Sequence, residues 1–534
     1  MATLKLSKSF WLLSIAAALI FFARGTELAG AQDVTPAEWL DSQVAPTFRP
    51  HNLMPPLTRY GWSLPFDARV SLAKRWGYAL EFGEYASTKS VGRALTQPSS
   101  DEARAVRLAI EEPDKFKLSI ILPRDMPELT TSNGWLKDAA GRTIRPKSPV
   151  WNPAADNKSL LGLIKMRTEP IEPLLRKVKP FIILNGGEYG IGPIGSSKKL
   201  WERDPRIIAA RGELSWYEYI SKMKAKEQIA IRHAVQKLAP NSIYVYYTNG
   251  GGTHNDRYRG WQNWTFSYPE MRGAGSFPSD EYYFAHFNDG FIRDARRKSG
   301  GKGDMLTQAL NAKGAEIAAG DLYSYDWVSG GWSARSSGGG TDGPAGRPST
   351  GDNAKVADPR VYGGFLKCLY LAGTMGANSG YYSYPLGGFG RKFPKDHPPP
   401  WLQQLVTVSR VHALFSYLEP FTRNSTLLPG TRKHEWGRYP AYELETSDPN
   451  VRALARQFKD KSMYLLVVWA PTSPGGTNVS VSLSGLTTLN LVGDSEGRIY
   501  LVRGQGDRYD AEEVNRENAD RIMKKNLGDT YINE

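Results

Sequence analysis

Short apolar runs alternate with helical segments along most of this 534-residue chain, beginning at Leu57. Apolar runs of about four to eight residues, bounded by glycine, proline or polar residues, are typical of buried strands, whereas apolar residues at every third or fourth position are typical of amphipathic helices. A regular alternation of the two predicts βα units, whose strands lie parallel in one sheet. The chain is therefore expected to be α/β over most of its length.

Eight strands are expected in this part of the chain, and by residue number they are 57–62, 77–82, 117–122, the run from 179 that leads to Glu188, 242–247, either 264–268 or 282–287, 321–327 and 379–384. The helices expected between and after them are 67–76, 103–111, 160–177, 214–238, 305–319, 362–375 and 401–418. Eight strand–helix units make a (β/α)8 TIM-type barrel over residues 32–425 the most economical fold. An open α/β sheet is the alternative, although no glycine-rich dinucleotide fingerprint follows the first strand.

The pattern changes after the Leu-Pro-Gly sequence at 428–430. Short strand-like runs joined by polar turns follow at 441–444, 463–469, 479–483 and 498–502. Runs of this kind, without helical segments between them, are typical of small antiparallel sheets. We therefore expect residues 426–534 to form a small all-β sandwich domain.

Residues 1–31 have the composition of a secretory signal peptide. Lys5 and Lys8 precede an apolar run at 10–22, which is too short to span a bilayer comfortably, and the small residues at 29–31 form a cleavage pattern. The mature chain is expected to begin near Gln32 and to be secreted or periplasmic. No later run is apolar for long enough to predict a transmembrane helix, so no membrane partner is expected.

The single cysteine, Cys368, excludes an intrachain disulfide. It lies in an apolar helical run, where a lone thiol is usually a core residue. An exported protein without disulfides must rely on a large hydrophobic core, which a chain of this length can build.

The formal net charge is +14, and the basic residues are scattered along the chain. There is no arginine-rich run and no recognisable nucleic-acid module, so no nucleic-acid partner is expected. A basic exported protein suits an anionic substrate such as a sulfated or uronate-containing glycan. The 15 Trp and 27 Tyr residues offer flat faces that suit sugar rings, although they are also ordinary core residues.

One expected strand ends in a glycine-rich turn that carries a carboxylate. The apolar run at 181–184 is followed by Asn185, two glycines and Glu188, with more glycine beyond. Glycines let the backbone turn sharply and leave room for a ligand. Because barrel enzymes place their reacting groups at the carboxyl ends of strands, Glu188 is a candidate catalytic residue and Asn185 a candidate substrate ligand. From this segment alone, a solvated loop residue is an equally good interpretation of Glu188.

A polar and aromatic excursion follows the fifth expected strand. It combines stacking surfaces with amides and cations, as sugar binding requires, and its candidate substrate-binding residues are Asn249, His254, Arg257, Trp261 and Trp264. The same cleft is expected to be lined from other strand ends by Trp62, Trp327 and Tyr384. A surface loop stabilised by its own aromatic residues is the alternative.

No metal or cofactor is expected. The chain has no HExxH motif and no histidine pair at ligand spacing, although His254 could be combined with Asn255 or Asp256. The glycines at 250–252 lack the Lys-Ser/Thr signature of a phosphate loop, and no Gly-x-Ser-x-Gly elbow follows a strand. The sequence leaves the oligomeric state open.

Two carboxylates that flank one bond are the minimum apparatus for glycoside cleavage. With strand-end carboxylates on an expected barrel and a β-sandwich after it, the chain resembles clan A glycoside hydrolases at the level of architecture. The resemblance implies that Glu188, after strand four, is the general acid/base and that Asp326, at the end of strand seven, is the nucleophile. The sequence departs from the family pattern at two places. The family has Asn directly before the glutamate of strand four, whereas two glycines separate Asn185 from Glu188 here. The family has a glutamate at the end of strand seven, where this sequence has Asp326. The alternatives for the second carboxylate are Glu84, Glu270 and Glu281.

The sequence therefore predicts an exported glycoside hydrolase that cleaves O-glycosidic bonds in a polysaccharide or oligosaccharide, with anionic, sulfated glycans as a substrate class that the charge favours. One alternative is a carbohydrate-binding barrel that has lost its catalytic carboxylates. The other is a polysaccharide lyase, whose unsaturated products absorb in the ultraviolet.

Overall fold

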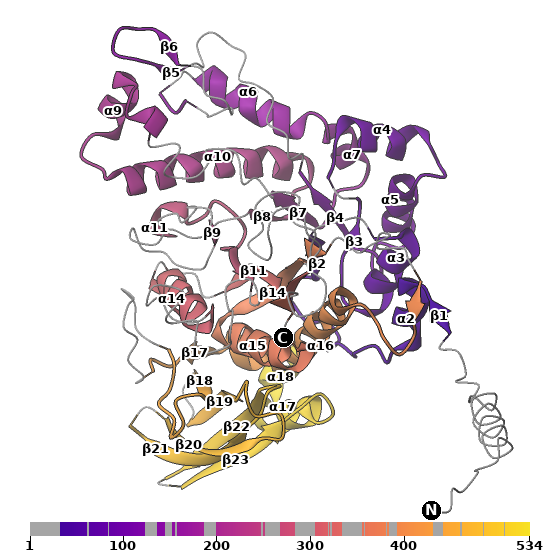
Figure 1. Ribbon diagram of the computed structural model, residues 1–534, viewed down its shortest axis with the longest axis vertical. Coiled ribbons are helices and arrows are strands. Elements are labelled where there is room, and N and C mark those ends of the chain that lie inside the picture. Colours follow the sequence, from indigo (N-terminus) through magenta and orange to yellow (C-terminus); the bar gives the residue numbers. More distant parts are fainter. Residues whose placement is uncertain are drawn as a thin grey trace, which may run out of the picture.

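The computed structural model describes residues 32–60, 64–83, 85–122, 136–144, 152–154, 157–185, 199–246, 249–250, 268–283, 305–318, 320, 323–333, 355–356, 358–380, 382–383, 392–430, 442–459, 462–483, 485–506 and 508–533. Within these residues the protein is a mixed α/β structure with several sheets (Figure 1). The signal peptide expected at 1–31 lies outside the described residues.

Parallel strands form two sheets in the first part of the chain. The five-stranded sheet has the order β2 (Thr58–Tyr60), β14 (Thr374–Gly380), β11 (Ser324–Ser329), β10 (Asp280–Tyr283), β9 (Asn249–Gly250). The four-stranded sheet has the order β3 (Leu80–Glu81), β4 (Leu118–Ile121), β7 (Ile182–Asn185), β8 (Ile243–Tyr246). Leu57, directly before β2, makes a parallel bridge with Tyr78, and β9 follows β8 after two residues.

Side chains of both sheets share one apolar core. Its members are Ile121, Ile182, Leu184 and Val245 of the four-stranded sheet with Tyr325 and Trp327 of β11. The intervening residues Ile120 and Ile183 belong to a different cluster, which contains helical side chains. Since successive strand residues point to opposite faces, the two sheets face each other across this core, and their outer faces meet helices.

The helices of this part are α3 (Phe66–Arg75), α4 (Thr88–Thr96), α5 (Asp101–Glu111), α6 (Asn157–Thr168), α7 (Glu172–Lys177), α9 (Pro205–Arg211), α10 (Trp216–Leu238), α11 (Tyr268–Met271), α14 (Met305–Ala318), α15 (Pro359–Ala372) and α16 (Pro400–Arg423). The longest expected helices therefore form close to their predicted bounds. At the start of α10, the Ser215 hydroxyl accepts from the Glu218 amide while the Glu218 carboxylate accepts from the Ser215 amide. This reciprocal pair satisfies two amides that the helix leaves without partners.

Several expected boundaries differ from the structure, and the single helix expected at 160–177 forms the two helices α6 and α7. The sixth strand is 280–283, close to the second of the two expected ranges. The eighth strand begins at Thr374 rather than 379, because Gly373 ends α15 in the left-handed region with φ 134°. Helix α16 continues beyond 418 to Arg423 with Pro420 inside it, and Asn424 closes its last turn through a side-chain bond to the Pro420 carbonyl.

Short elements complete the first part of the chain. They are β1 (Asp33–Val34) paired with β16 (Phe393–Pro394), α2 (Pro36–Ser42), the hairpin of β5 (Leu136–Lys137) and β6 (Thr143–Ile144), and the small sheet of β12 (Gly331–Ser333), β13 (Lys355–Val356) and β15 (Tyr382–Ser383).

Antiparallel strands dominate the C-terminal part. One sheet has the order β17 (Ser425–Leu427), β18 (Arg452–Phe458), β19 (Met463–Trp469), β22 (Arg498–Gln505), β23 (Arg508–Val514), and a second contains β20 (Thr477–Leu483) and β21 (Thr487–Gly493). The chain then forms α17 (Ala519–Leu527) and α18 (Asp529–Asn533), so the expectation of an all-β region was wrong. Residues 442–444 are not in a strand, although a strand was expected there, and the 425/426 boundary falls inside β17.

The five-stranded antiparallel sheet buries both faces. Alternate residues such as Leu466 and Val468 pack with β20 and β21, as the two layers of a sandwich do. The opposite set, including Leu465 and Val467, belongs to the large core that also contains α15, α16 and α17. Figure 1 shows α15 and α16 between the parallel strands and this sheet.

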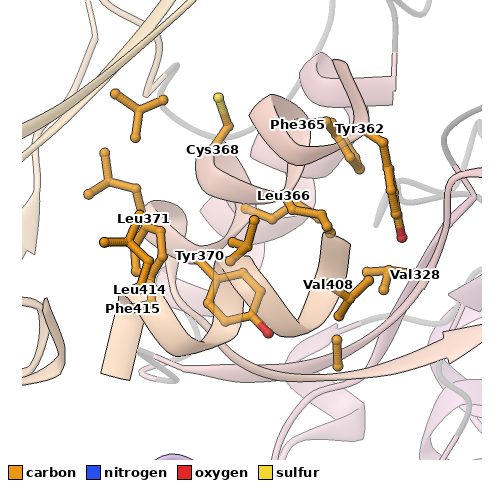
Figure 2. Close-up of a cluster of buried hydrophobic side chains, with 14 of the residues drawn as sticks. Val328, Tyr362, Phe365, Leu366, Cys368, Tyr370, Leu371, Val408, Leu414 and Phe415 are labelled. Carbon is orange, nitrogen blue, oxygen red and sulfur yellow. The ribbon is translucent and has the colours of Figure 1, made fainter. Parts of the chain in front are cut away.

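Helix α15 lies at the centre of the largest core. Figure 2 shows Tyr362, Phe365 and Leu366 among side chains of β11 and α16. Cys368 is buried in the same cluster, which confirms its expected role in packing. On the side toward the C-terminal sheet, Gly364 lies so close to Trp469 that a Cβ atom would come within 2.3 Å of the indole ring.

His412 of α16 is a buried core residue. Its Nδ1 lies 3.1 Å from the Tyr370 hydroxyl, and Phe48 contacts the ring edge-on. Burial lowers the pKa of His412 to about 3, against an opposing hydrogen bond to the Pro55 backbone. Because proline has no N–H, the imidazole donates that bond, which leaves Nδ1 to accept from Tyr370.

This lowered pKa predicts acid sensitivity. The unfolded chain protonates His412 near pH 6.5, whereas the folded chain resists protonation down to about pH 3. The free energy of unfolding should therefore fall by up to about 1.4 kcal/mol per pH unit from pH 6.5 downward. Urea denaturation at a series of pH values should show a smaller decline for His412→Gln, which stays neutral. An equal decline in both proteins would contradict the assignment.

Candidate active site

Most residues predicted for the site follow the carboxyl ends of the parallel strands, outside the described residues. They are Trp62, Glu188, His254, Arg257, Trp261, Trp264 and Tyr384, together with the alternative carboxylate Glu84. Asn249 is described as part of β9, where it pairs with Asp280. The described residues that frame the site are therefore those at the strand ends themselves.

Asn185, the last residue of β7, is 2 % exposed and anchors the strand to α10. Its Nδ2 donates to Oε1 of Gln228 and to the Tyr244 hydroxyl, each over 2.9 Å. The Tyr244 hydroxyl in turn donates to the same Gln228 oxygen over 2.8 Å. This geometry favours an anchoring role for Asn185 over the predicted contact with substrate.

The hydrogen bonds of Asn185 connect to a buried ion pair on α10. Gln228 donates to Glu227 over 3.3 Å, and Glu227 pairs with Lys224 over 3.1 Å, with both charged side chains buried. The polar network on α10 therefore holds the carboxyl end of β7 in place. Glu188 is three residues further along the chain, so its Cα can lie at most about 11 Å from that of Asn185.

Asp326 lies in β11 with no exposed surface. Its Oδ2 accepts from Lys313 Nζ at 2.9 Å, Ser324 Oγ at 2.7 Å and Thr374 Oγ1 at 2.5 Å. Lys313 belongs to α14, so Asp326 points to the helix-covered face of the sheet. The nucleophilic role of Asp326 stays a prediction, and this geometry favours a structural role.

The same cluster holds further buried charges. Lys313 also pairs with Glu316 over 3.1 Å. Burial lowers the pKa of Lys313, but Asp326 and Glu316 outweigh that effect, so its pKa is raised. Burial raises the pKa of Glu316 well above its ordinary value, and Lys313 opposes this only in part. A cation shared by several carboxyl groups thus joins α14 to β11.

Trp327 was predicted to stack on sugar, and the structure places it 1 % exposed in the core between the two parallel sheets. Its neighbours there include Leu184 and Val245. Tyr325, on the same face, shares a hydrogen bond of 2.9 Å with Thr58 of β2. The face of β11 that carries Tyr325 and Trp327 is the interior one.

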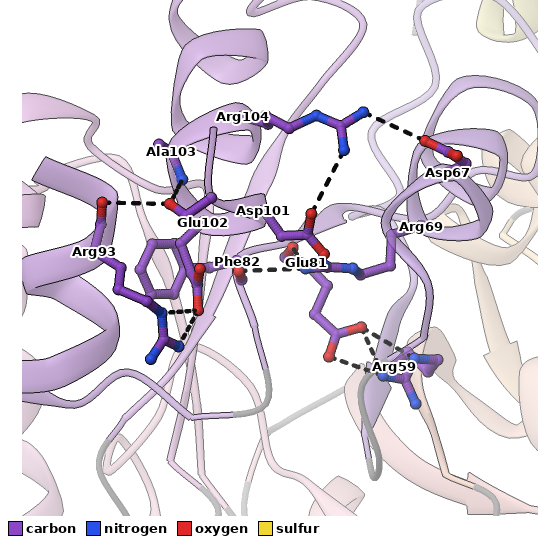
Figure 3. A network of polar contacts seen from close by, with 11 residues as sticks. Arg59, Asp67, Arg69, Glu81, Phe82, Arg93, Asp101, Glu102, Ala103 and Arg104 are labelled. Atoms are coloured by element: carbon purple, nitrogen blue, oxygen red, sulfur yellow. Dashed lines mark hydrogen bonds and ion pairs between the residues drawn. The ribbon is translucent and has the colours of Figure 1, made fainter. Parts of the chain in front are cut away.

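An ion pair at the ends of β2 and β3 was not found by the sequence analysis. The Arg59 guanidinium donates to both carboxylate oxygens of Glu81 at 2.8–3.0 Å, and both side chains are buried (Figure 3). Arg69 of α3 donates to the Glu81 carbonyl over 3.1 Å and to Asp101 of α5 over 2.8 Å. Glu81 lies near the end of an expected strand, but nothing in the sequence indicates that Arg59 is its partner.

Across the ranges that the structure describes, no group of three or more His, Cys, Asp or Glu side chains could hold a metal ion. The described helices also include none that is both long and apolar enough to cross a membrane.

The buried position of Asp326 predicts a large effect on stability. Asp326→Asn keeps the volume but removes the charge that faces Lys313, and breaking a buried pair costs about 3–5 kcal/mol. The free energy of unfolding, measured by urea denaturation, should fall by this order. Asp396→Asn is the matched control, because Asp396 is exposed and pairs with the exposed His397; it should change stability by about 0.5 kcal/mol or less. Equal stabilities of Asp326→Asn and wild type would exclude a structural role.

No protein-family model and no curated protein matches the sequence. Solved structures that are similar to the chain are glycoside hydrolases. Gan42B, a GH42 β-galactosidase from G. stearothermophilus, is 7 % identical with a TM-score of 0.48, covering 86 % of this chain and 100 % of that one. The maltogenic α-amylase AmyB from Thermotoga neapolitana is 9 % identical with a TM-score of 0.38, covering 77 % and 81 %. A β-galactosidase from Halorubrum lacusprofundi is 10 % identical with a TM-score of 0.40, covering 68 % of this chain, which spans 58 % of that enzyme's length. At these values the likeness identifies neither a substrate nor a catalytic residue.

Proposed function

We propose that this chain is an exported glycoside hydrolase that cleaves O-glycosidic bonds in a polysaccharide or oligosaccharide, with Glu188 as general acid/base. The observation that carries the proposal is the position of Glu188, three residues after the buried parallel strand β7. Parallel strands present their carboxyl ends at one edge of the sheet, where α/β enzymes bind their ligands. Export rests on the signal-like composition of residues 1–31.

The proposal includes a closed (β/α)8 barrel. Its support is the pairing of β14 with β2, the parallel bridge between Leu57 and Tyr78, and the short step from β8 to β9. Counted as one strand, β8 and β9 bring the parallel strands to eight in chain order, which is the number a TIM-type barrel needs. The apolar core shared by β4, β7, β8 and β11 would then be the barrel interior.

Glu188 acts as the acid that protonates the leaving oxygen. It must be protonated when it does so, and burial or a neighbouring carboxylate has to raise its pKa for this purpose. A second carboxylate then attacks the anomeric carbon or activates water.

Glu281 is our proposed second carboxylate in preference to Asp326. In the ladder between β10 and β11, position 281 pairs in register with Trp327, whereas position 326 pairs with Ala377 of β14. Residues opposite each other in a ladder share a face of the sheet. Position 281 therefore belongs to the interior face with Trp327, and position 326 to the face that meets α14.

The substrate would bind among residues that follow the strand ends. Aromatic faces suited to sugar rings come from Trp62, Trp261, Trp264 and Tyr384, and polar groups come from Asn249, His254 and Arg257. The formal net charge of +14 favours an anionic glycan, because a basic surface concentrates anions.

A carbohydrate-binding protein without activity is the second candidate. It is favoured by the burial of Asp326 against Lys313, which withdraws the carboxylate that the family resemblance assigns as nucleophile. The two functions differ in turnover, whereas both predict binding of a saccharide.

Release of reducing ends from neutral, sulfated and uronate-containing polysaccharides tests the proposal. Glu188→Gln should lower kcat by about 10²–10⁴-fold and change KM little, because it removes proton transfer but retains the shape of the side chain. Glu172→Gln is the control and should match wild type, because Glu172 is half-exposed on α7 and pairs with Arg176 of the same helix.

Three results would contradict this prediction. Full activity of Glu188→Gln would move the acid elsewhere in the chain. Products that absorb in the ultraviolet would indicate a lyase. Saccharide binding without any turnover in wild type would favour the binding protein.

The choice between the two second carboxylates has its own test. Glu281→Gln should abolish turnover and leave the free energy of unfolding within about 1 kcal/mol of wild type. Asp326→Asn should lower stability, yet its folded fraction should keep most of kcat. Turnover that survives in Glu281→Gln but disappears in stably folded Asp326→Asn would restore Asp326 as the catalytic carboxylate.

A further inference from the structure

A cavity of about 520 Å³ lies between the helix pair α15–α16 and the C-terminal strands. Its walls come from Gly363 and Lys367 of α15, Thr407 and Arg410 of α16, and the segments around Glu496 and Arg516. The volume is within the range of small-molecule sites and exceeds what an inorganic ion needs. Figure 1 shows the C-terminal strands on the far side of α15 and α16 from the parallel strands.

The cationic side chains that line the cavity are of two kinds: engaged ones, which form an ion pair or hydrogen bond, and unengaged ones, which form neither within the described residues. Arg498 pairs with Asp494 at 2.9 Å and Glu513 at 3.0 Å, and Arg360 pairs with Asp358 at 3.0 Å. Lys367 donates to the Gly497 carbonyl over 2.8 Å. In contrast, the guanidinium groups of Arg410 and Arg516 make no hydrogen bond or ion pair within the described part of the chain.

The two unengaged arginines act on each other. Burial lowers the pKa of Arg410, and the like charge of Arg516 lowers it further, while Glu496 opposes this. Both arginines are exposed and line the same cavity. A bound oxyanion would offset the repulsion between their like charges and accept several N–H donors.

The remaining lining indicates what the anion is attached to. Glu496, Glu517 and Asn515 offer acceptors for hydroxyl groups, and Thr407 offers a hydroxyl of its own. Val411 and Leu414 of α16 provide an apolar wall. Acceptors, an apolar surface and paired cations together suit a ring that carries both hydroxyl groups and one carboxylate or sulfate.

We propose that this cavity is a binding site for a hydroxylated organic anion of the uronic acid or sugar sulfate class, with Arg410 and Arg516 holding the oxyanion. The site is separate from the strand ends at which Glu188 is expected. Its existence does not depend on the proposed glycosidase activity.

Isothermal titration calorimetry on the full chain tests the site. The probes are D-glucuronate, D-glucose and inorganic sulfate, each at the same ionic strength set with sodium chloride. D-glucuronate should bind saturably to wild type, and the double variant Arg410→Gln/Arg516→Gln should bind it at least tenfold more weakly. Arg508→Gln is the matched control, because Arg508 is an exposed arginine of β23 that does not line the cavity; its affinity should equal that of wild type.

Two further measurements test whether binding occurs in this cavity and whether each variant is folded. The variant Trp261→Ala/Trp264→Ala removes two aromatic faces of the proposed catalytic site. It should bind D-glucuronate as tightly as wild type, which separates the cavity from that site even if no activity is found. Thermal unfolding checks the fold of each variant, and Arg516→Gln alone replaces the double variant if the latter is unstable.

The proposal is overturned by any of four results: no saturable binding of D-glucuronate, equal affinity in the double variant Arg410→Gln/Arg516→Gln, equal affinity for D-glucose, or loss of binding in Trp261→Ala/Trp264→Ala. Binding of sulfate without binding of D-glucuronate would also overturn it, because the cavity would then hold a simple ion.

Discussion

The pairing of β2 with β14 is the contact on which the parallel sheets depend. Thr58 and Asn378, 320 residues apart in sequence, are register partners joined by a hydrogen bond of 3.0 Å. Thr58 also contacts the hydroxyl of Tyr325, which belongs to the core between the sheets. Joining such distant segments costs loop entropy that local contacts cannot offset. The apolar interior and the helices packed outside it must provide that stability.

Two networks of buried charge lie on the outer face of the parallel strands. Asp326 meets Lys313 of α14, and Asn185 is connected through Gln228 to the pair of Glu227 and Lys224 on α10. Each network joins a strand to a helix, so it specifies how the helix sits on the sheet. Interior positions such as Leu184 and Trp327 are apolar instead. The polar groups proposed to act on substrate are Asn249 of β9, Glu281 of β10 and residues of the segments that follow the strand ends.

The sequence predicted the elements whose pattern is local. The apolar period and the Ser215–Glu218 capping box define α10, and four- to six-residue apolar runs define β4 and β7. The sequence did not predict features that depend on contacts between distant parts of the chain. Which face Asp326 occupies is set by contacts with β14 and α14. The strands β18, β21 and β23 were not among the expected runs, and β23 carries several charged residues. For the site, sequence order placed Glu188 after a strand, but the Arg59–Glu81 pair requires two strands to meet and could not be anticipated.

Helix α15 is packed on both sides, by the parallel strands and by the C-terminal sheet. On the latter side, Gly364 leaves room for Trp469, whose Nε1 donates to the Ser495 carbonyl over 3.1 Å. Neither residue can change alone, since a side chain at 364 collides with the indole and a smaller residue at 469 leaves a void. In evolutionary terms, these two positions should drift together among related sequences. The helical part and the C-terminal part would then be inherited as one unit, and exchange of the C-terminal part between relatives would succeed only where this pair matches.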